Sequence, residues 1–83
     1  MRITVRLFAR LRDIVGRGEL ARDVPVGATV QAIWNALVDE YPALAPYAAV
    51  SSCAVNEEYA RFTSVLEDGD EIAFLPPVSG GAV

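Results

Sequence analysis

The sequence contains no histidine and a single cysteine, Cys53. Without histidine, the chain lacks the usual general base and the commonest metal ligand, so it cannot build a Ser-His-Asp or Cys-His catalytic unit by itself. One cysteine excludes an intramolecular disulfide and any metal site that needs four cysteine ligands. The chain therefore offers few of the residues with which enzymes usually carry out chemistry.

Lysine is also absent, since all seven basic residues are arginine. A lysine-free chain cannot carry a conjugate on a side-chain amine, although the simplest explanation is a GC-rich genome that favours arginine codons. The eleven carboxylates give a net charge of −4 and a pI near 4.5. Nucleic-acid binding normally requires a basic surface, so we expect a protein partner and no nucleic acid.

Long hydrophobic runs are missing as well. No apolar stretch approaches the roughly 20 residues that span a bilayer. Residues 1–6 alternate apolar and polar side chains and do not resemble a signal peptide. We therefore expect a cytoplasmic protein without membrane association. A chain of 83 residues that is 53% hydrophobic suffices for one domain with a modest core.

The hydrophobic pattern predicts one principal helix, over residues 30–41, where apolar side chains recur at helical spacing. Thr29 is a suitable N-cap for this helix, and Pro42 should end it. Alternating apolar and polar residues between turn signals predict the strands. The strands are expected at residues 2–8, 19–24, 53–56, 59–62 and 72–75. Residues 9–15 should form one or two helical turns that end at Gly16, and residues 42–50 a loop with a helical turn.

This order of elements predicts an α+β protein in which one helix packs on one face of a single mixed sheet of four to five strands. By analogy, the first and last strands should lie side by side in the middle of the sheet, which is the β-grasp arrangement of ubiquitin-like proteins. We expect the ubiquitin-like domain to occupy residues 1–77 and a flexible, extended C-terminal tail to occupy residues 78–83.

The C-terminal segment has a composition suited to reaching into another protein. Pro76 and Pro77 favour a stiff polyproline conformation, and no residue after Glu71 carries a charged side chain. Gly80 and Gly81 lack a Cβ atom and can thread a narrow channel. Residues 76–81 can span about 20 Å when extended. A glycine carboxylate on such an arm can be adenylated and then converted to a thiocarboxylate by partner enzymes, although a glycine-rich tail taken alone is more typical of an inert, disordered terminus.

Three segments of the chain resemble the small subunits of molybdopterin synthase, which are ubiquitin-like sulfur carriers. The most specific segment is residues 66–81, LEDGDEIAFLPPVSGG. Residues 7–16, LFARLRDIVG, are similar to the family's second motif, and residues 54–56, AVN, match a short middle segment. The resemblance covers nearly the whole chain, and it implies a β-grasp sulfur carrier that is not an enzyme by itself.

The resemblance implies a cycle of sulfur loading and delivery in molybdenum cofactor biosynthesis. A ubiquitin-activating-like adenylyltransferase would use ATP and magnesium, which this chain does not itself bind, to adenylate the carboxyl group of Gly81. A sulfur donor protein would convert that group to a thiocarboxylate. The large molybdopterin synthase subunit would then receive the tail and pass the sulfur to cyclic pyranopterin monophosphate. No cofactor or metal site is expected on the chain itself.

The resemblance also assigns roles to individual residues. Gly81 would carry the reacting carboxyl group. The arm that threads the partner's channel would consist of Pro76, Pro77, Val78, Ser79 and Gly80. Possible partner contacts lie at Phe8, Arg12, Phe74 and Leu75. For the apolar residues in this last set, a place in the core is an equally open interpretation, and for Arg12 a solvated or turn-stabilising role is open.

The last two residues depart from the family's pattern, because Ala82 and Val83 follow Gly81. Val83 is β-branched and would fit a glycine-shaped channel poorly. Three explanations are open. Either a peptidase removes Ala82 and Val83, or the two residues were introduced during cloning, or the protein is a divergent carrier that never forms the thiocarboxylate. We predict that Ala82 and Val83 must be removed before sulfur can be loaded.

Other residues that attract attention have ordinary structural explanations. Cys53 is expected to be a small buried residue rather than a persulfide carrier. Asp68 and Asp70 are expected to form a turn rather than a metal site, and Trp34 to lie in the core. Three other functions stay open: a sister carrier for thiamin, cysteine or tRNA thiolation, a protein modifier attached through Gly81 to lysines, and an interaction module with an inert tail.

Overall fold

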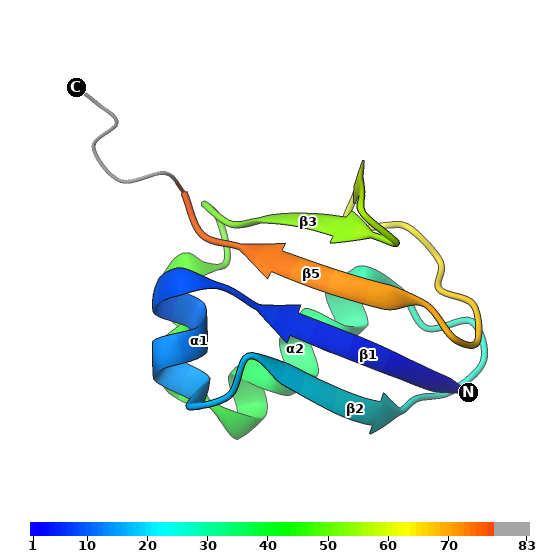
Figure 1. Cartoon of the computed structure of the whole chain (residues 1–83), viewed down its shortest axis with the longest axis horizontal. Helices are drawn as coiled ribbons and strands as arrows, with labels where there is room; N and C mark the ends of the chain where they lie inside the picture. The colour runs from blue at the N-terminus through cyan, green and yellow to red at the C-terminus, as the bar shows by residue number, and fades with distance from the viewer. Residues whose placement is uncertain (78–83) are drawn as a thin grey trace.

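A single mixed sheet organises the chain in the computed structural model, which describes residues 1–77. Its strands are β1 (Arg2–Leu7), β2 (Glu19–Asp23), β3 (Ser52–Val55), β4 (Glu58–Ala60) and β5 (Glu71–Leu75). Their order across the sheet is β2-β1-β5-β3-β4 (Figure 1). Strand β5 runs parallel to β1 and antiparallel to β3. The first and last strands are therefore neighbours in the middle of the sheet, and the predicted β-grasp arrangement is confirmed.

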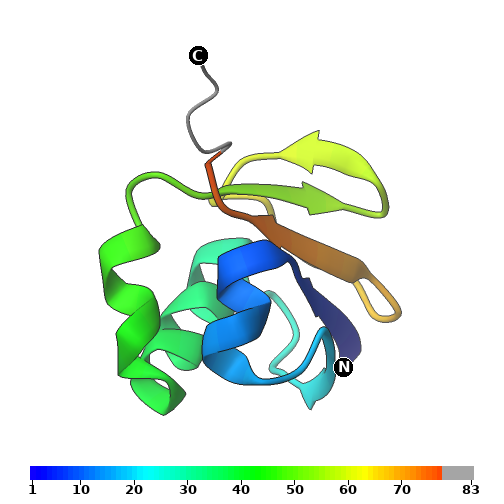
Figure 2. The same ribbon diagram turned by 60° about the vertical axis from the view of Figure 1, so that its left-hand side comes forward.

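The helices cover one face of this sheet, as Figure 2 shows. They are α1 (Ala9–Val15), α2 (Val30–Glu40) and the 3₁₀ helix η1 (Pro42–Tyr47). The Thr29 hydroxyl accepts a hydrogen bond from the Ala32 amide at 3.2 Å, which confirms the predicted N-cap of α2. The helix ends at Glu40, one residue earlier than predicted, because Pro42 disfavours helical geometry at Tyr41, where ψ is 81°.

The core lies between the sheet and α2. Strand β1 buries every second side chain, and β5 buries Ile72 and Phe74 in the same layer. From the helix side, α2 contributes Val30, Ile33, Trp34 and Leu37. Trp34 is only 1% exposed, so its predicted place in the core is confirmed. Burial of these apolar side chains is the main stabilising contribution to a domain of this size.

The hairpin between β3 and β4 turns one residue earlier than the gap between the predicted strands at residues 53–56 and 59–62. The turn residues are Asn56 and Glu57, with φ of 52° and 72°, and not Glu57 and Glu58. Two-residue hairpins favour turns in which both central residues have positive φ, because that twist matches the twist of the strands. The Asn56 side chain also accepts a hydrogen bond from the Glu71 amide at 3.0 Å. This contact attaches the hairpin to the start of β5 and sets its register.

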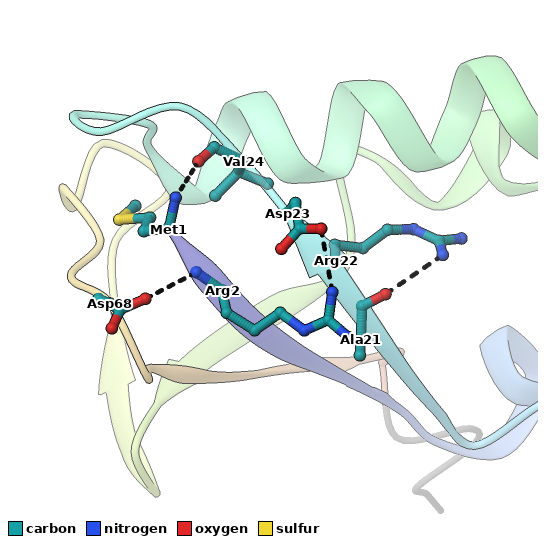
Figure 3. Close-up of polar contacts among 7 residues, drawn as sticks. All are labelled: Met1, Arg2, Ala21, Arg22, Asp23, Val24 and Asp68. Atoms are coloured by element: carbon teal, nitrogen blue, oxygen red, sulfur yellow. Dashed lines mark hydrogen bonds and ion pairs between the residues drawn. The ribbon is translucent and has the colours of Figure 1, made fainter.

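The acidic segment before β5 is a structural turn, as predicted. Asp70 accepts hydrogen bonds from the Glu67 amide at 2.8 Å and from Asn56 Nδ2 at 2.9 Å. Asp68 accepts one from the Arg2 amide at 2.7 Å (Figure 3). Across residues 1–77, no group of three or more His, Cys, Asp or Glu side chains is placed to hold a metal ion. None of the helices described is both long and apolar enough to cross a membrane.

Candidate functional site

The C-terminal segment leaves the sheet at the C-terminal ends of the two central strands, β1 and β5. Because β1 and β5 are parallel, both end at the same edge of the sheet, where Leu7 pairs with Phe74. The chain continues from β1 directly into α1 and from β5 into Pro76 and Pro77 (Figure 1). Both strands are held by neighbours on either side, so the exit point of the tail is fixed by the most firmly paired part of the fold.

The residues assigned to the far end of the tail lie outside the described residues. They are Val78, Ser79, Gly80, Gly81, Ala82 and Val83. Their roles in threading a channel and in carrying the thiocarboxylate therefore stay predictions, as does the domain boundary at residue 77. The structure places only the first two residues of the arm, Pro76 and Pro77, which follow β5 without any regular secondary structure.

A largely apolar hollow of about 590 Å³ lies beside this exit. We call it the exit hollow; its lining residues are Phe8, Ala9, Arg10, Tyr47, Leu75, Pro76 and Pro77. They come from three separate parts of the chain: the junction of β1 with α1, the end of η1, and the end of β5. An open apolar surface of this kind, next to the end of β5, is suited to docking another protein.

Two of the predicted contact residues, Phe8 and Leu75, line the exit hollow. Phe8 is half-buried, and the guanidinium carbon of Arg6 lies 5.4 Å from the centre of its ring. A cation over an aromatic face at this distance is attracted to it, so Arg6 helps to hold the ring in place. Leu75 is also half-buried and lies on the sheet face opposite α2. Both side chains are placed where a partner can reach them.

Phe74, by contrast, is fully buried and belongs to the core. Its ring centre lies 5.1 Å from that of Trp34 and 6.0 Å from that of Phe62. Neighbouring residues of a strand point to opposite faces, so Phe74 faces α2 while Leu75 faces away from it. Of the two interpretations that the sequence left open for Phe74, the structure therefore shows the core role.

Arg12 does not line the exit hollow. Its side chain is exposed and its stem passes close to Gly18, where an added Cβ would lie 3.2 Å from Arg12 Cδ. Its backbone carbonyl accepts the Gly16 amide at 2.7 Å, which closes the end of α1. The structure thus gives Arg12 a backbone role at the helix terminus and leaves its guanidinium on the surface.

Sequence reasoning did not single out Ala9, Arg10 or Tyr47, which complete the lining. Ala9 and Arg10 belong to the motif at residues 7–16, so the resemblance contained a signal for them. Ala9 has a φ of 51°, in the left-handed region, which costs an L-residue roughly 1–2 kcal/mol. Tyr47 carries no sequence signal, because only the packing of η1 brings it to this edge.

Cys53 is a buried structural residue, as predicted. Its side chain is 1% exposed, and its Sγ atom lies 3.3 Å from the carbonyl oxygen of Ala60. Burial raises the pKa of the Cys53 thiol, because the thiolate would lose its hydration in the core. A buried thiol with a raised pKa is a poor nucleophile, and it lies on the inward face of β3 rather than in the exit hollow.

Comparison with known proteins identifies the family of this chain. The ThiS family profile matches residues 5–81. The chain belongs to the ThiS family. A curated relative, the molybdopterin synthase sulfur carrier subunit of Escherichia coli, is 40% identical over 81 residues, which cover 95% of this chain and 99% of the relative.

Solved structures of ThiS-like proteins share the fold. Small archaeal modifier protein 1 of H. volcanii has a TM-score of 0.80 at 31% identity and covers 93% of this chain and 98% of its own. In the complex of subunits 1 and 2 of the molybdopterin-converting factor from Helicobacter pylori, the matching chain has a TM-score of 0.68 at 26% identity. That match covers 98% of this chain and 100% of the other. The ThiS-family match ends at Gly81, the residue for which the resemblance implied the reacting carboxyl group.

Proposed function

We propose that this chain is the sulfur-carrier subunit of a molybdopterin synthase. One observation supports it above the rest: the central strand β5 leads into Pro76-Pro77 beside the apolar exit hollow, and the family match runs on to Gly81. The fold thus fixes the start of a segment without charged side chains next to a surface suited to docking. The relative from E. coli is named as the sulfur carrier subunit of molybdopterin synthase.

The proposed chemistry takes place at the carboxyl group of Gly81. The carboxylate attacks the α-phosphorus of ATP, which releases pyrophosphate and leaves a glycyl adenylate. A persulfide sulfur of a donor protein then displaces AMP to give an acyl disulfide. A thiol attacks the donor's sulfur in that bond, which leaves the thiocarboxylate on Gly81 and a disulfide on the donor. When the sulfur passes to cyclic pyranopterin monophosphate, hydrolysis of the acyl group regenerates the carboxylate. The chain acts as a carrier and not as an enzyme by itself.

Catalysis is assigned to the partners in this proposal. The chain has no histidine, and the exit hollow is lined by aromatic, aliphatic and proline side chains with one arginine. Such a lining suits protein docking better than the binding of a nucleotide with its magnesium ion, for which carboxylate and phosphate-binding groups are typical. We therefore propose that a ubiquitin-activating-like adenylyltransferase binds ATP and magnesium. We expect this cycle to run in the cytoplasm.

The large synthase subunit is the proposed partner at the exit hollow. The solved complex of the two subunits from H. pylori supports this choice, because its small subunit matches this chain over nearly its whole length. Docking at Phe8 and Leu75 would place the arm from Pro76 at the mouth of the partner's channel. Apolar anchors that enter pockets commonly provide most of the binding energy at such interfaces.

Removal of Ala82 and Val83 remains part of the proposal. Val83 is β-branched, with two methyl groups on its Cβ atom, whereas Gly80 and Gly81 have no Cβ atom at all. A channel fitted to glycine would exclude Val83. We therefore expect that a chain ending at Gly81 is adenylated and loaded with sulfur, and that the chain ending at Val83 is not.

The test is reconstitution with the chain in both lengths. Each is incubated with the cognate adenylyltransferase, ATP, magnesium and a sulfur source, and intact mass spectrometry detects the replacement of one oxygen by sulfur. The loaded chain is then mixed with the large subunit and cyclic pyranopterin monophosphate, and molybdopterin is measured. A loaded chain that yields no molybdopterin would reject this pathway in favour of a sister carrier. Loading of the chain ending at Val83 would reject the trimming step.

A protein-modifier function is the second candidate, because the archaeal modifier protein resembles this chain in fold and sequence. In that case the activated Gly81 would form an amide with lysine side chains of target proteins. An epitope-tagged chain, expressed in its own cells, would give bands of higher mass on denaturing gels. The sulfur-carrier function predicts no such bands, and deletion of Gly80 and Gly81 serves as the control.

A further inference from the structure

Three residues other than glycine have a backbone in the left-handed region: Ala9, Asn56 and Glu57, among the residues that the structure describes. An L-residue with a Cβ atom is strained there, and glycine is not. Asn56 and Glu57 lie in the hairpin turn, where positive φ is required, and Asn56 gains two side-chain hydrogen bonds. The hairpin therefore explains two of the three strained residues.

Ala9 has no such local compensation from its own side chain, because a methyl group forms no hydrogen bonds. The backbone must turn sharply at this position, since β1 ends at Leu7 and α1 begins at Ala9. The turn is closed by the amides of Leu11 and Arg12, which donate to the carbonyl of Phe8 at 3.1 and 3.4 Å. All of these are backbone contacts that a glycine at position 9 would preserve. Glycine at position 9 would therefore make the fold more stable than alanine does.

Ala9 is exposed and lines the exit hollow between Phe8 and Arg10. Resting on the function proposed above, we propose that the Ala9 methyl group is a docking contact for the large synthase subunit. The strained backbone holds this methyl group on the surface that the partner covers. Strained residues concentrate at functional sites for this reason: the local conformation serves binding at the expense of stability.

The test compares Ala9→Gly with Glu57→Gly in the chain ending at Gly81. Both substitutions relieve left-handed strain, but Glu57 lies in the hairpin at the other end of the sheet, away from the exit hollow. Both variants should melt roughly 2–6 °C above the parent, because relief of strain exceeds the added freedom of the unfolded chain. Affinity for the large subunit, measured by calorimetry, should fall about fourfold for Ala9→Gly, the equivalent of one buried methyl group. It should not change for Glu57→Gly.

A third variant, Ala9→Asn, separates contact from backbone rigidity. Asparagine tolerates the left-handed region, so it keeps the turn rigid while it places a larger polar group in the hollow. If the methyl group is a contact, Ala9→Asn binds the large subunit more weakly than Ala9→Gly. If Ala9→Asn binds as tightly as the parent, rigidity alone mattered and the inference is wrong.

The remaining outcomes also test the role of Ala9 and separate it from the proposed function. Unchanged affinity of Ala9→Gly, with the parent binding normally, overturns the role of Ala9 and leaves the proposed function intact. A loss confined to adenylation, with normal affinity for the large subunit, overturns it as well. Failure of the parent itself to bind the cognate large subunit overturns the proposed function together with this inference.

Discussion

Phe74 and Leu75 are adjacent in sequence but should respond to substitution in opposite ways. Phe74 is fully buried against Trp34 and Phe62, whereas Leu75 faces away from α2 and lines the exit hollow where β5 ends. We therefore expect Phe74→Leu to lower stability without changing the docking surface. Leu75→Ala should weaken docking and have little effect on stability.

The magnitudes follow from the contacts. Phe74→Leu removes two aromatic pairs, each worth about 0.5–1.5 kcal/mol, and leaves a small gap, so we expect a loss of about 2 kcal/mol. A chain of this length is stable by about 4–12 kcal/mol, so the variant stays folded and its Tm falls by roughly 10 °C. Leu75→Ala removes apolar atoms that are half-buried before docking; we expect a stability loss below about 1 kcal/mol and about tenfold weaker binding.

Urea denaturation gives the free energy of unfolding of each variant, and titration calorimetry gives its affinity for the large subunit. Affinity is measured well below the Tm of Phe74→Leu, so that both variants are fully folded. If Phe74→Leu lowers affinity tenfold while Leu75→Ala leaves it unchanged, the assignment of core and surface at this strand end is wrong. Equal effects on both quantities would show that the two residues act as one unit.

Three further substitutions test other parts of the structure. Asp70→Ala removes the acceptor for Asn56 and for the Glu67 amide and should cost about 1–2 kcal/mol in urea denaturation; an unchanged midpoint would show that this turn is held by other contacts. Thr29→Ala should cost about 1 kcal/mol by loss of the N-cap of α2, whereas Thr29→Ser should not. Cys53 has a raised pKa, so the unfolded chain loses the thiol proton first, and wild-type stability should fall as the pH rises above about 8.5. The stability of Cys53→Ala should lack this part of the decline. Identical pH profiles of stability for the parent and Cys53→Ala would refute a contribution from the Cys53 thiol.

The sequence by itself determined most of the elements and the charge-free composition of the tail. Apolar periodicity located α2 and most of the strand residues, since a stripe at helical spacing and alternation at spacing two are local properties of the chain. Thr29 and Pro42 marked the ends of α2 through local backbone chemistry. The charge-free arm after Glu71 is likewise a property of composition alone.

Only the tertiary structure decided which of these residues line the exit hollow. Alternation places Phe74 and Leu75 on opposite faces, but which face is buried depends on the side of the sheet that α2 covers. The exit hollow joins Ala9, Tyr47 and Leu75 from distant parts of the chain, and no local pattern encodes that meeting. The left-handed backbone of Ala9 lies where the chain turns sharply from β1 into α1, which is a demand of packing rather than of local preference.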